Sequence, residues 1–136
     1  MAYPLENDLF PLNIFEENYQ KLNKILINGF NDLAKNEGEI WLIPQLAEQY
    51  SIQILSLTQE KLDIALTHYY TNNGDLVLDP EFVLRVYPEL KILEVMQYHD
   101  KFGIQKSYHS DGRINPEIKI QLNQYFGRWV DMLNVD

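Results

Sequence analysis

The spacing of the hydrophobic residues predicts an amphipathic helix near the start of the chain. Between residues 13 and 33, apolar side chains recur at intervals of three and four, which places them on one stripe of a helix. Asn13 and Glu16 can form a capping box at its start, and Gly38 is expected to end it. Residues 1–12 lack this periodicity, so we expect an arm on the surface.

The middle of the chain changes to a period of two, which is typical of strands with one buried face. The alternating segments cover residues 52–57, 62–69, 82–87, 90–95 and 104–108. Asn72–Asp75 and Pro88–Glu89 are expected turns, and a short connection is expected at Asp79–Pro80. Residues 40–43 are a short apolar run that is either a strand or a tether under the sheet. Links this short do not allow parallel crossovers, so we expect an antiparallel meander of four to five strands.

The C-terminal segment returns to helical spacing. Its apolar stripe runs from Ile118 to Leu133, after Asn115, a good N-cap, and Pro116, which suits the first helical position. Two amphipathic helices and one sheet predict an α+β fold in which both helices pack on the same face of the sheet. The sequence shows no linker, so residues 1–136 are expected to form a single domain.

Composition and charge exclude several functional classes. The 136 residues are 46% hydrophobic and 23% charged, which is typical of a globular protein. The formal net charge of −9 repels phosphate backbones, so we expect no direct binding of nucleic acid. No apolar run reaches the roughly 18 residues that cross a bilayer, and the N-terminus lacks the basic start of a signal peptide. We therefore expect a cytoplasmic protein with no membrane partner. The chain has no cysteine, which excludes disulfides and thiolate chemistry.

Three motifs resemble a known family. They are Leu12–Leu22, with a Glu-x-Asn-aromatic-x-x-Leu pattern; Leu84–Tyr87, followed by Glu94–Val95; and Gln121–Trp129, with Asn-Gln-aromatic and a nearby Trp. In this order they resemble the YqiB-like proteins, a bacterial family of unknown function, over nearly the whole chain. The resemblance implies a compact cytoplasmic bacterial protein and supplies no substrate. Where the family pattern has Tyr-His-Asp-Ala, this chain has Tyr87–Leu90, so no catalytic role is carried over to that turn.

The richest group of polar side chains comes from two predicted strands. His68 and Tyr70 share one face of the first strand, and Tyr98, His99 and Asp100 follow one another on the second. If the strands are adjacent, His68 could meet Tyr98 or His99, with Asp100 as an orienting carboxylate, in a set suited to acid–base chemistry. No nucleophile accompanies these residues, and tyrosine is also common on half-exposed sheet faces. The pattern therefore favours a non-catalytic surface.

Metal and cofactor sites are not indicated by the sequence. The three histidines do not stand at a spacing that chelates a metal on one element, and Asn73, Asp75 and Asp79 lack the spacing of an EF-hand loop. The six glycines form neither a GxGxxG pattern nor a P-loop. We expect no metal and no cofactor.

These observations favour a non-catalytic protein-binding or adaptor module. We expect the contact surface on the sheet face that the helices leave uncovered, with Tyr70 and Tyr98, and at Trp41, whose segment has weak periodicity. Two alternatives stay open: a small-molecule-binding protein or enzyme that uses the histidine, tyrosine and aspartate group, and an acidic DNA mimic that inhibits a nucleic-acid-binding protein. The partner is an unknown protein, and a homodimer through the open face or an edge strand also fits the pattern.

Overall fold

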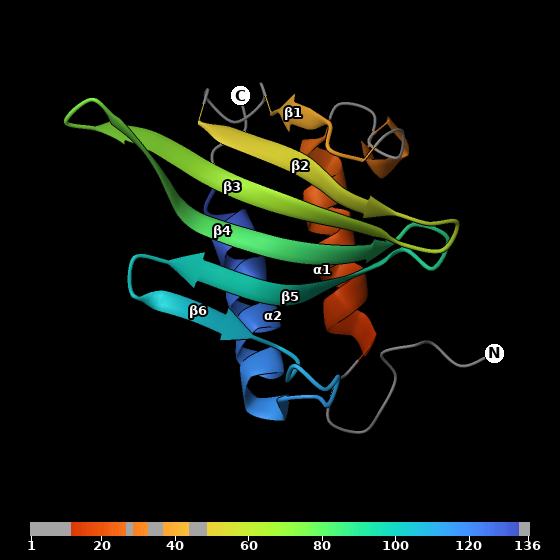
Figure 1. The fold of residues 1–136 in the computed structure, drawn as a ribbon. Helices are drawn as coiled ribbons and strands as arrows, with labels where there is room; N and C mark the ends of the chain where they lie inside the picture. The colour runs from red at the N-terminus through yellow and green to blue at the C-terminus, as the bar shows by residue number, and fades with distance from the viewer. Residues whose placement is uncertain (1–11, 27–28, 33–36, 44–48, 134–136) are drawn as a thin grey trace.

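The computed structural model describes residues 12–26, 29–32, 37–43 and 49–133. Its elements are α1 (Leu12–Ile25), the 3-10 helix η1 (Gly29–Asp32), β1 (Ile40–Leu42), β2 (Tyr50–Leu57), β3 (Leu62–Asn72), β4 (Asp75–Tyr87), β5 (Ile92–Asp100), β6 (Gly103–Lys106) and α2 (Pro116–Asp131). Figure 1 shows the sheet in front and both long helices behind it. Of the predicted N-terminal arm, only Leu12 is described, and it begins α1.

The strands form one antiparallel sheet in which each strand lies beside its neighbours in sequence. The predicted α+β class is confirmed, but the predicted number of four to five strands is wrong, because the sheet has six. The additional strand is β1, the apolar run that the sequence left as either a strand or a tether. It pairs Trp41 with Ile52 and Leu42 with Ser51.

The predicted turn between β3 and β4 is confirmed. Asn72 pairs with Asp75, and the two residues between them have φ angles of 53° for Asn73 and 86° for Gly74. Asparagine and glycine adopt such positive φ angles more readily than other residues, which explains why this sequence forms a tight hairpin.

The connection predicted at Asp79–Pro80 is wrong, because β4 continues through these residues. The register between β3 and β4 shifts between Thr67 and Tyr69, where β4 has one extra residue, so this part of β4 forms a bulge rather than a link. The other predicted turn, at Pro88–Glu89, is confirmed between the end of β4 and the start of β5.

The first helix is shorter than predicted. It begins at Leu12, so Asn13 is already helical rather than a cap, and it ends at Ile25 rather than continuing to Gly38. The chain then enters η1 through Gly29, whose φ is 66°. Helical spacing therefore continues in the sequence beyond the end of the helix.

A side-chain hydrogen bond and a ring contact fix this turn. Asn23 Oδ1 accepts a hydrogen bond from the Phe30 N–H at 2.9 Å, and a Cβ on Gly29 would lie 2.5 Å from the same oxygen. The turn places the buried Phe30 ring 4.9 Å from the ring of Tyr19. Phe30 thus reaches the core that its position in the predicted stripe indicated, but from η1 rather than from α1.

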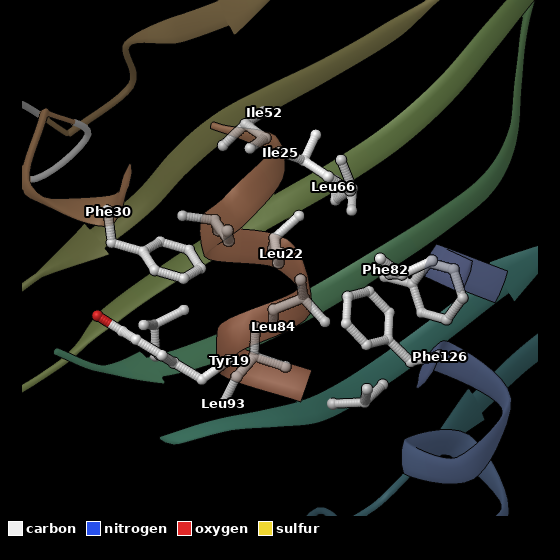
Figure 2. Close-up of a cluster of buried hydrophobic side chains, with 14 of the residues drawn as sticks. Tyr19, Leu22, Ile25, Phe30, Ile52, Leu66, Phe82, Leu84, Leu93 and Phe126 are labelled. Atoms are coloured by element: carbon white, nitrogen blue, oxygen red, sulfur yellow. The ribbon is translucent and has the colours of Figure 1, made fainter. Parts of the chain in front are cut away.

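The second helix begins as predicted, with Asn115 as N-cap and Pro116 in the first turn. Both helices bury their apolar stripes against the same side of the sheet. Figure 2 shows Leu22 of α1 and Phe126 of α2 packed with sheet residues such as Leu84. The predicted packing of two helices on one face is therefore what the structure has.

The opposite side of the sheet, which we call the far face, carries polar pairs and no described helix. Arg85 forms two hydrogen bonds to the Asp63 carboxylate, at 2.9 and 3.1 Å. Thr67 Oγ1 donates to Glu81 at 3.1 Å. Neighbouring strands thus pair these polar side chains with one another within the sheet.

The outer edge of β5 is only partly covered by β6, which pairs with residues 97–100. Next to this ladder, side chains make the hydrogen bonds to β5 that a neighbouring strand would otherwise make. Asn123 Oδ1 accepts a hydrogen bond from the Val95 N–H at 3.0 Å, and Ser107 Oγ donates to the Val95 carbonyl at 2.6 Å. Asn18 Nδ2 donates to the Asn123 carbonyl at 2.9 Å. This network, in which Asn18, Ser107 and Asn123 are all buried, joins α1, α2 and β5.

Gly127 allows the two helices to approach closely at this point. A Cβ on Gly127 would lie 2.8 Å from Asn18 Oδ1 and 3.4 Å from Lys21 Nζ. Lys21 Nζ also lies 2.9 Å from the Asp131 carboxylate, one turn further along α2. The absence of a side chain at residue 127 therefore sets the distance between α1 and α2.

We expect Asn123→Leu to lower the free energy of unfolding by about 2–4 kcal/mol, because the buried Val95 N–H loses its acceptor. Urea denaturation with a fitted m-value measures the change. Gln124→Leu, at the next and exposed position, is the matched control and should change stability little. Equal losses for the two variants would contradict the role of the network.

Replacing glycine by alanine inside a helix normally stabilises it by about 1 kcal/mol. For Gly127→Ala we expect the opposite sign, a loss of roughly 1–3 kcal/mol, because the new methyl group overlaps Asn18. In an Asn18→Ala background the same change should cost less, and a double-mutant cycle in urea measures the difference. Additive effects would show that the close approach is unimportant.

Candidate functional site

The helices cover only part of the sheet. Figure 1 shows the β3–β4 and β5–β6 turns at the same end of the sheet, to the left of α2, and we call this the hairpin end. Because strand side chains alternate between the two faces, every second side chain there lies on the side of α2. These side chains form a shelf beside the helix instead of a surface beneath it.

An unbroken series of aromatic rings runs along this shelf. Its members, which we call the aromatic row, are Tyr70, His68, Tyr50, Trp129, Phe82, Tyr98 and Tyr125. Successive ring centroids lie 5.8, 4.9, 6.0, 5.0, 5.0 and 5.4 Å apart. These separations are those of favourable aromatic pairs, so the rings support one another's positions.

Strand register explains how residues distant in sequence form this row. Tyr50 lies opposite His68, and Phe82 lies opposite Tyr98, so these four side chains share the helix side of the sheet. Phe82 is fully buried and joins the row to the core, whereas the other three are half-buried. The row therefore has a rigid base and an accessible upper surface.

Two adjoining hollows open along the row, and together we call them the groove. The smaller, of about 360 Å³, is lined by Tyr98, Asp100, Phe102, Gly103, Ile104 and Gln105. The larger, of about 410 Å³, is lined by Tyr98, Asp100, Gln105, Gln121, Leu122, Tyr125 and Arg128. Tyr98, Asp100 and Gln105 border both hollows, so they lie where the two meet.

Charge and protonation in the groove are set by a few contacts. Burial raises the pKa of Tyr98 far above its usual range, and the neighbouring Tyr125 and Asp100 raise it further, so its hydroxyl stays protonated. Asp100 Oδ1 accepts a hydrogen bond from the Phe102 N–H at 2.8 Å, which fixes the carboxylate. Arg128, in the last turn of α2, is exposed and forms no ion pair with any described residue.

The predicted acid–base group is not assembled. β4 lies between β3 and β5, so the two strands that carry these residues are not adjacent, which was the condition for this group to form. His99 lies opposite Glu81, which shares the far face with Thr67, whereas His68 points to the helix side. His68 Nδ1 lies 3.0 Å from the Asp79 carbonyl oxygen. The structure thus separates the two histidines by the thickness of the sheet.

The predicted contact residues lie on a different face from the one expected. Tyr70 and Tyr98 belong to the aromatic row on the helix side, not to the far face, which carries Tyr69 and His99 instead. Trp41 also points to the helix side, opposite Ile52, and packs against the hydrophobic core while half-buried. The expectation that Tyr70 and Tyr98 lie on the uncovered face is therefore corrected.

Several residues of the groove were not predicted as a site. Tyr125 belongs to the apolar stripe of α2 by spacing, yet 37% of its surface is exposed, and it lines the larger hollow. In the sequence, Arg128 lies outside the apolar stripe of the predicted helix, and Gln105 lies in a predicted strand without any other distinguishing feature. Gln105 lies opposite Tyr98 only because β6 pairs with β5 in this register. No local pattern in the sequence predicts that register.

A second group of ionisable side chains is buried near the start of α2. Lys119 Nζ lies 3.0 Å from Glu94 Oε1 and donates to Tyr108 Oη at 2.8 Å, and Tyr108 also bonds to Glu94. The side chains of Lys119 and Glu94 are each 1% exposed. A substrate has no access to this group, so its role is to hold the start of α2 against β5.

In the described part of the chain, no group of three histidine, cysteine, aspartate or glutamate side chains is placed to hold a metal ion. None of the described helices is long and apolar enough to span a membrane.

The fold and the groove define an antiparallel α+β protein with an aromatic surface beside its C-terminal helix. A family model described as a domain of unknown function, DUF6908, matches residues 48–135. The match covers more than half of the chain, which therefore belongs to the DUF6908 family. It includes β2–β6 and α2, and with them the whole aromatic row and the groove. No curated protein and no solved structure matches the chain.

We expect Lys119→Met to lower the free energy of unfolding by about 3–5 kcal/mol, because Glu94 would remain buried without its cation. Adding Glu94→Leu should recover much of this loss, because no charge is then left unpaired. Thermal and urea unfolding measure both effects. Lys106→Met, at an exposed position on β6, is the control. If the double variant loses as much free energy of unfolding as the two single variants together, the two buried side chains do not depend on each other, and the prediction is wrong.

Proposed function

We propose that this protein is a non-catalytic protein-binding module and that its contact surface is the aromatic row with the groove. The observation that carries the proposal is the continuity of the row from Tyr70 to Tyr125 beside an open groove. Half-exposed aromatic side chains on a rigid base supply contact area at a small cost in conformational entropy.

The residue types of this surface support the proposal. Tyrosine and arginine are among the residues that most often dominate binding energy at protein interfaces. The accessible tyrosines of the row and Arg128 provide both types, whereas Trp129 is buried. The side chains project from strands and from a helix whose position the Asn123 network fixes. A surface of this kind binds without large rearrangement.

The two alternatives receive less support. An enzyme that uses His68 and His99 would need both on one side of the sheet, and they lie on opposite sides. A DNA mimic would need free carboxylates at phosphate spacing, but those of Asp63, Glu94 and Asp131 are paired with cations. These three carboxylates are therefore not available to imitate phosphates.

Two finer expectations belong to the same proposal. A second copy of the chain is one candidate partner for the row, and the partner assay below includes it by measuring the oligomeric state. The second is that the chain is a bacterial, cytoplasmic protein of the YqiB-like type, which is consistent with a small adaptor. The motif resemblance is the only support for it.

Selection from a displayed library of random peptides tests the proposal without a known partner. We expect peptides that bind the immobilised chain, and we expect the variant Tyr70→Ser/Tyr125→Ser to weaken their binding by at least about tenfold. Tyr69→Ser is the matched control, because it removes the same side chain from the next position of β3 on the far face. Light scattering reports any dimer that competes for the row.

The proposal fails if no peptide is enriched and the chain is monomeric. It also fails if Tyr69→Ser weakens binding as much as the double variant does. Circular dichroism of all variants confirms that the comparison is made between folded proteins.

A further inference from the structure

The groove also indicates what kind of partner it fits. Resting on the proposed function, we infer that the partner segment is basic and that a lysine or arginine side chain binds at Asp100, beside the rings of Tyr98 and Phe102. The inference comes from where the carboxylate lies, what surrounds it and the charge of the whole chain.

Asp100 has the central position in the groove. It lines both hollows, whereas Arg128 lines only the larger one. Its Oδ1 is held by the Phe102 N–H, so the carboxylate keeps one orientation without a ligand. The carboxylate also faces the Tyr98 hydroxyl, whose pKa it raises, and Asp100 borders the smaller hollow together with Gln105. A fixed carboxylate of this kind accepts charge-assisted hydrogen bonds at little cost in entropy.

The rings around Asp100 suit a cation. Tyr98 and Phe102 line the smaller hollow with it, and Tyr125 joins them in the larger one. Aromatic faces attract ammonium and guanidinium groups, most strongly where water is partly excluded. The chain already shows this contact at the same turn, where Lys101 Nζ lies 5.2 Å from the centroid of the Phe102 ring.

The charge of the chain acts in the same direction. The formal net charge is −9, so the protein as a whole attracts a basic segment and repels an acidic one. Arg128 is the opposing charge in the groove. Its exposed position at the rim sets the orientation of a bound cation, which is directed away from Arg128 and toward Asp100.

Two charge-neutralising variants test the inference with the peptides that the library yields. Asp100→Asn should weaken binding by about tenfold, because the charge-assisted bond is lost. Asparagine can still accept the Phe102 N–H, so the turn is kept. Arg128→Gln should leave binding unchanged or strengthen it. Asp75→Asn is the matched control, because it changes the net charge equally at an exposed turn that does not line the groove. Calorimetry measures all four affinities.

Enrichment of lysine and arginine in the selected peptides, with the expected order of variants, supports the inference. Acidic peptides, or peptides that Arg128→Gln weakens and Asp100→Asn does not, would overturn it while the proposed binding function stands. An effect of Asp75→Asn as large as that of Asp100→Asn would also overturn it, since binding would then follow net charge alone. Failure of the proposed function itself is distinguished by the absence of any enriched peptide.

Discussion

The structure depends on how the open edge of β5 is satisfied. A strand edge that is buried without partners leaves polar backbone groups unpaired, at a cost of about 1–3 kcal/mol for each group. β6 is too short to cover this edge, and Asn123 and Ser107 bond to the two polar groups of Val95 in its place. The same Asn123 is tied through its backbone carbonyl to Asn18 of α1. One buried network therefore closes the sheet and fixes both helices.

The position of the groove follows from this constraint. Asn123 holds α2 over β5, and Tyr125 and Arg128 lie two and five positions further along the same helix. They consequently stand above Tyr98 and Asp100, which lie three and five positions beyond Val95 on β5. The tyrosine rings meet edge to face at 5.4 Å. The distance between helix and strand at the network thus sets the width of the groove a short way along the same two elements.

Local chemistry predicts the parts of the fold that depend on few residues. The Asn73–Gly74 turn and the start of α2 at Pro116 follow from backbone preferences, and the structure has both. The end of α1 does not follow, because the Asn23 bond to Phe30 turns the chain while the apolar spacing continues. Of the candidate site, the sequence indicated Tyr70, Tyr98 and Asp100 but not Tyr125, Arg128 or Gln105. The alternation of residues predicts which side chains of a strand share a face. It does not predict the strand order, in which β4 lies between β3 and β5 and separates His68 from His99.

Residues of the motifs that carry the family resemblance also take part in the buried network. Asn18 lies in the first motif and Asn123 in the last, and the structure brings them together with Gly127 at the crossing of the two helices. Glu94, in the central motif, is the buried partner of Lys119. These motif residues therefore have a structural role, because each satisfies a buried polar group or permits a close approach. The accessible rings of Tyr50, Tyr70 and Tyr98 lie outside those motifs, on the strands that the network holds in place. Tyr125 and Arg128 of the groove nevertheless lie in the last motif, so that motif carries residues of the scaffold and of the candidate site together.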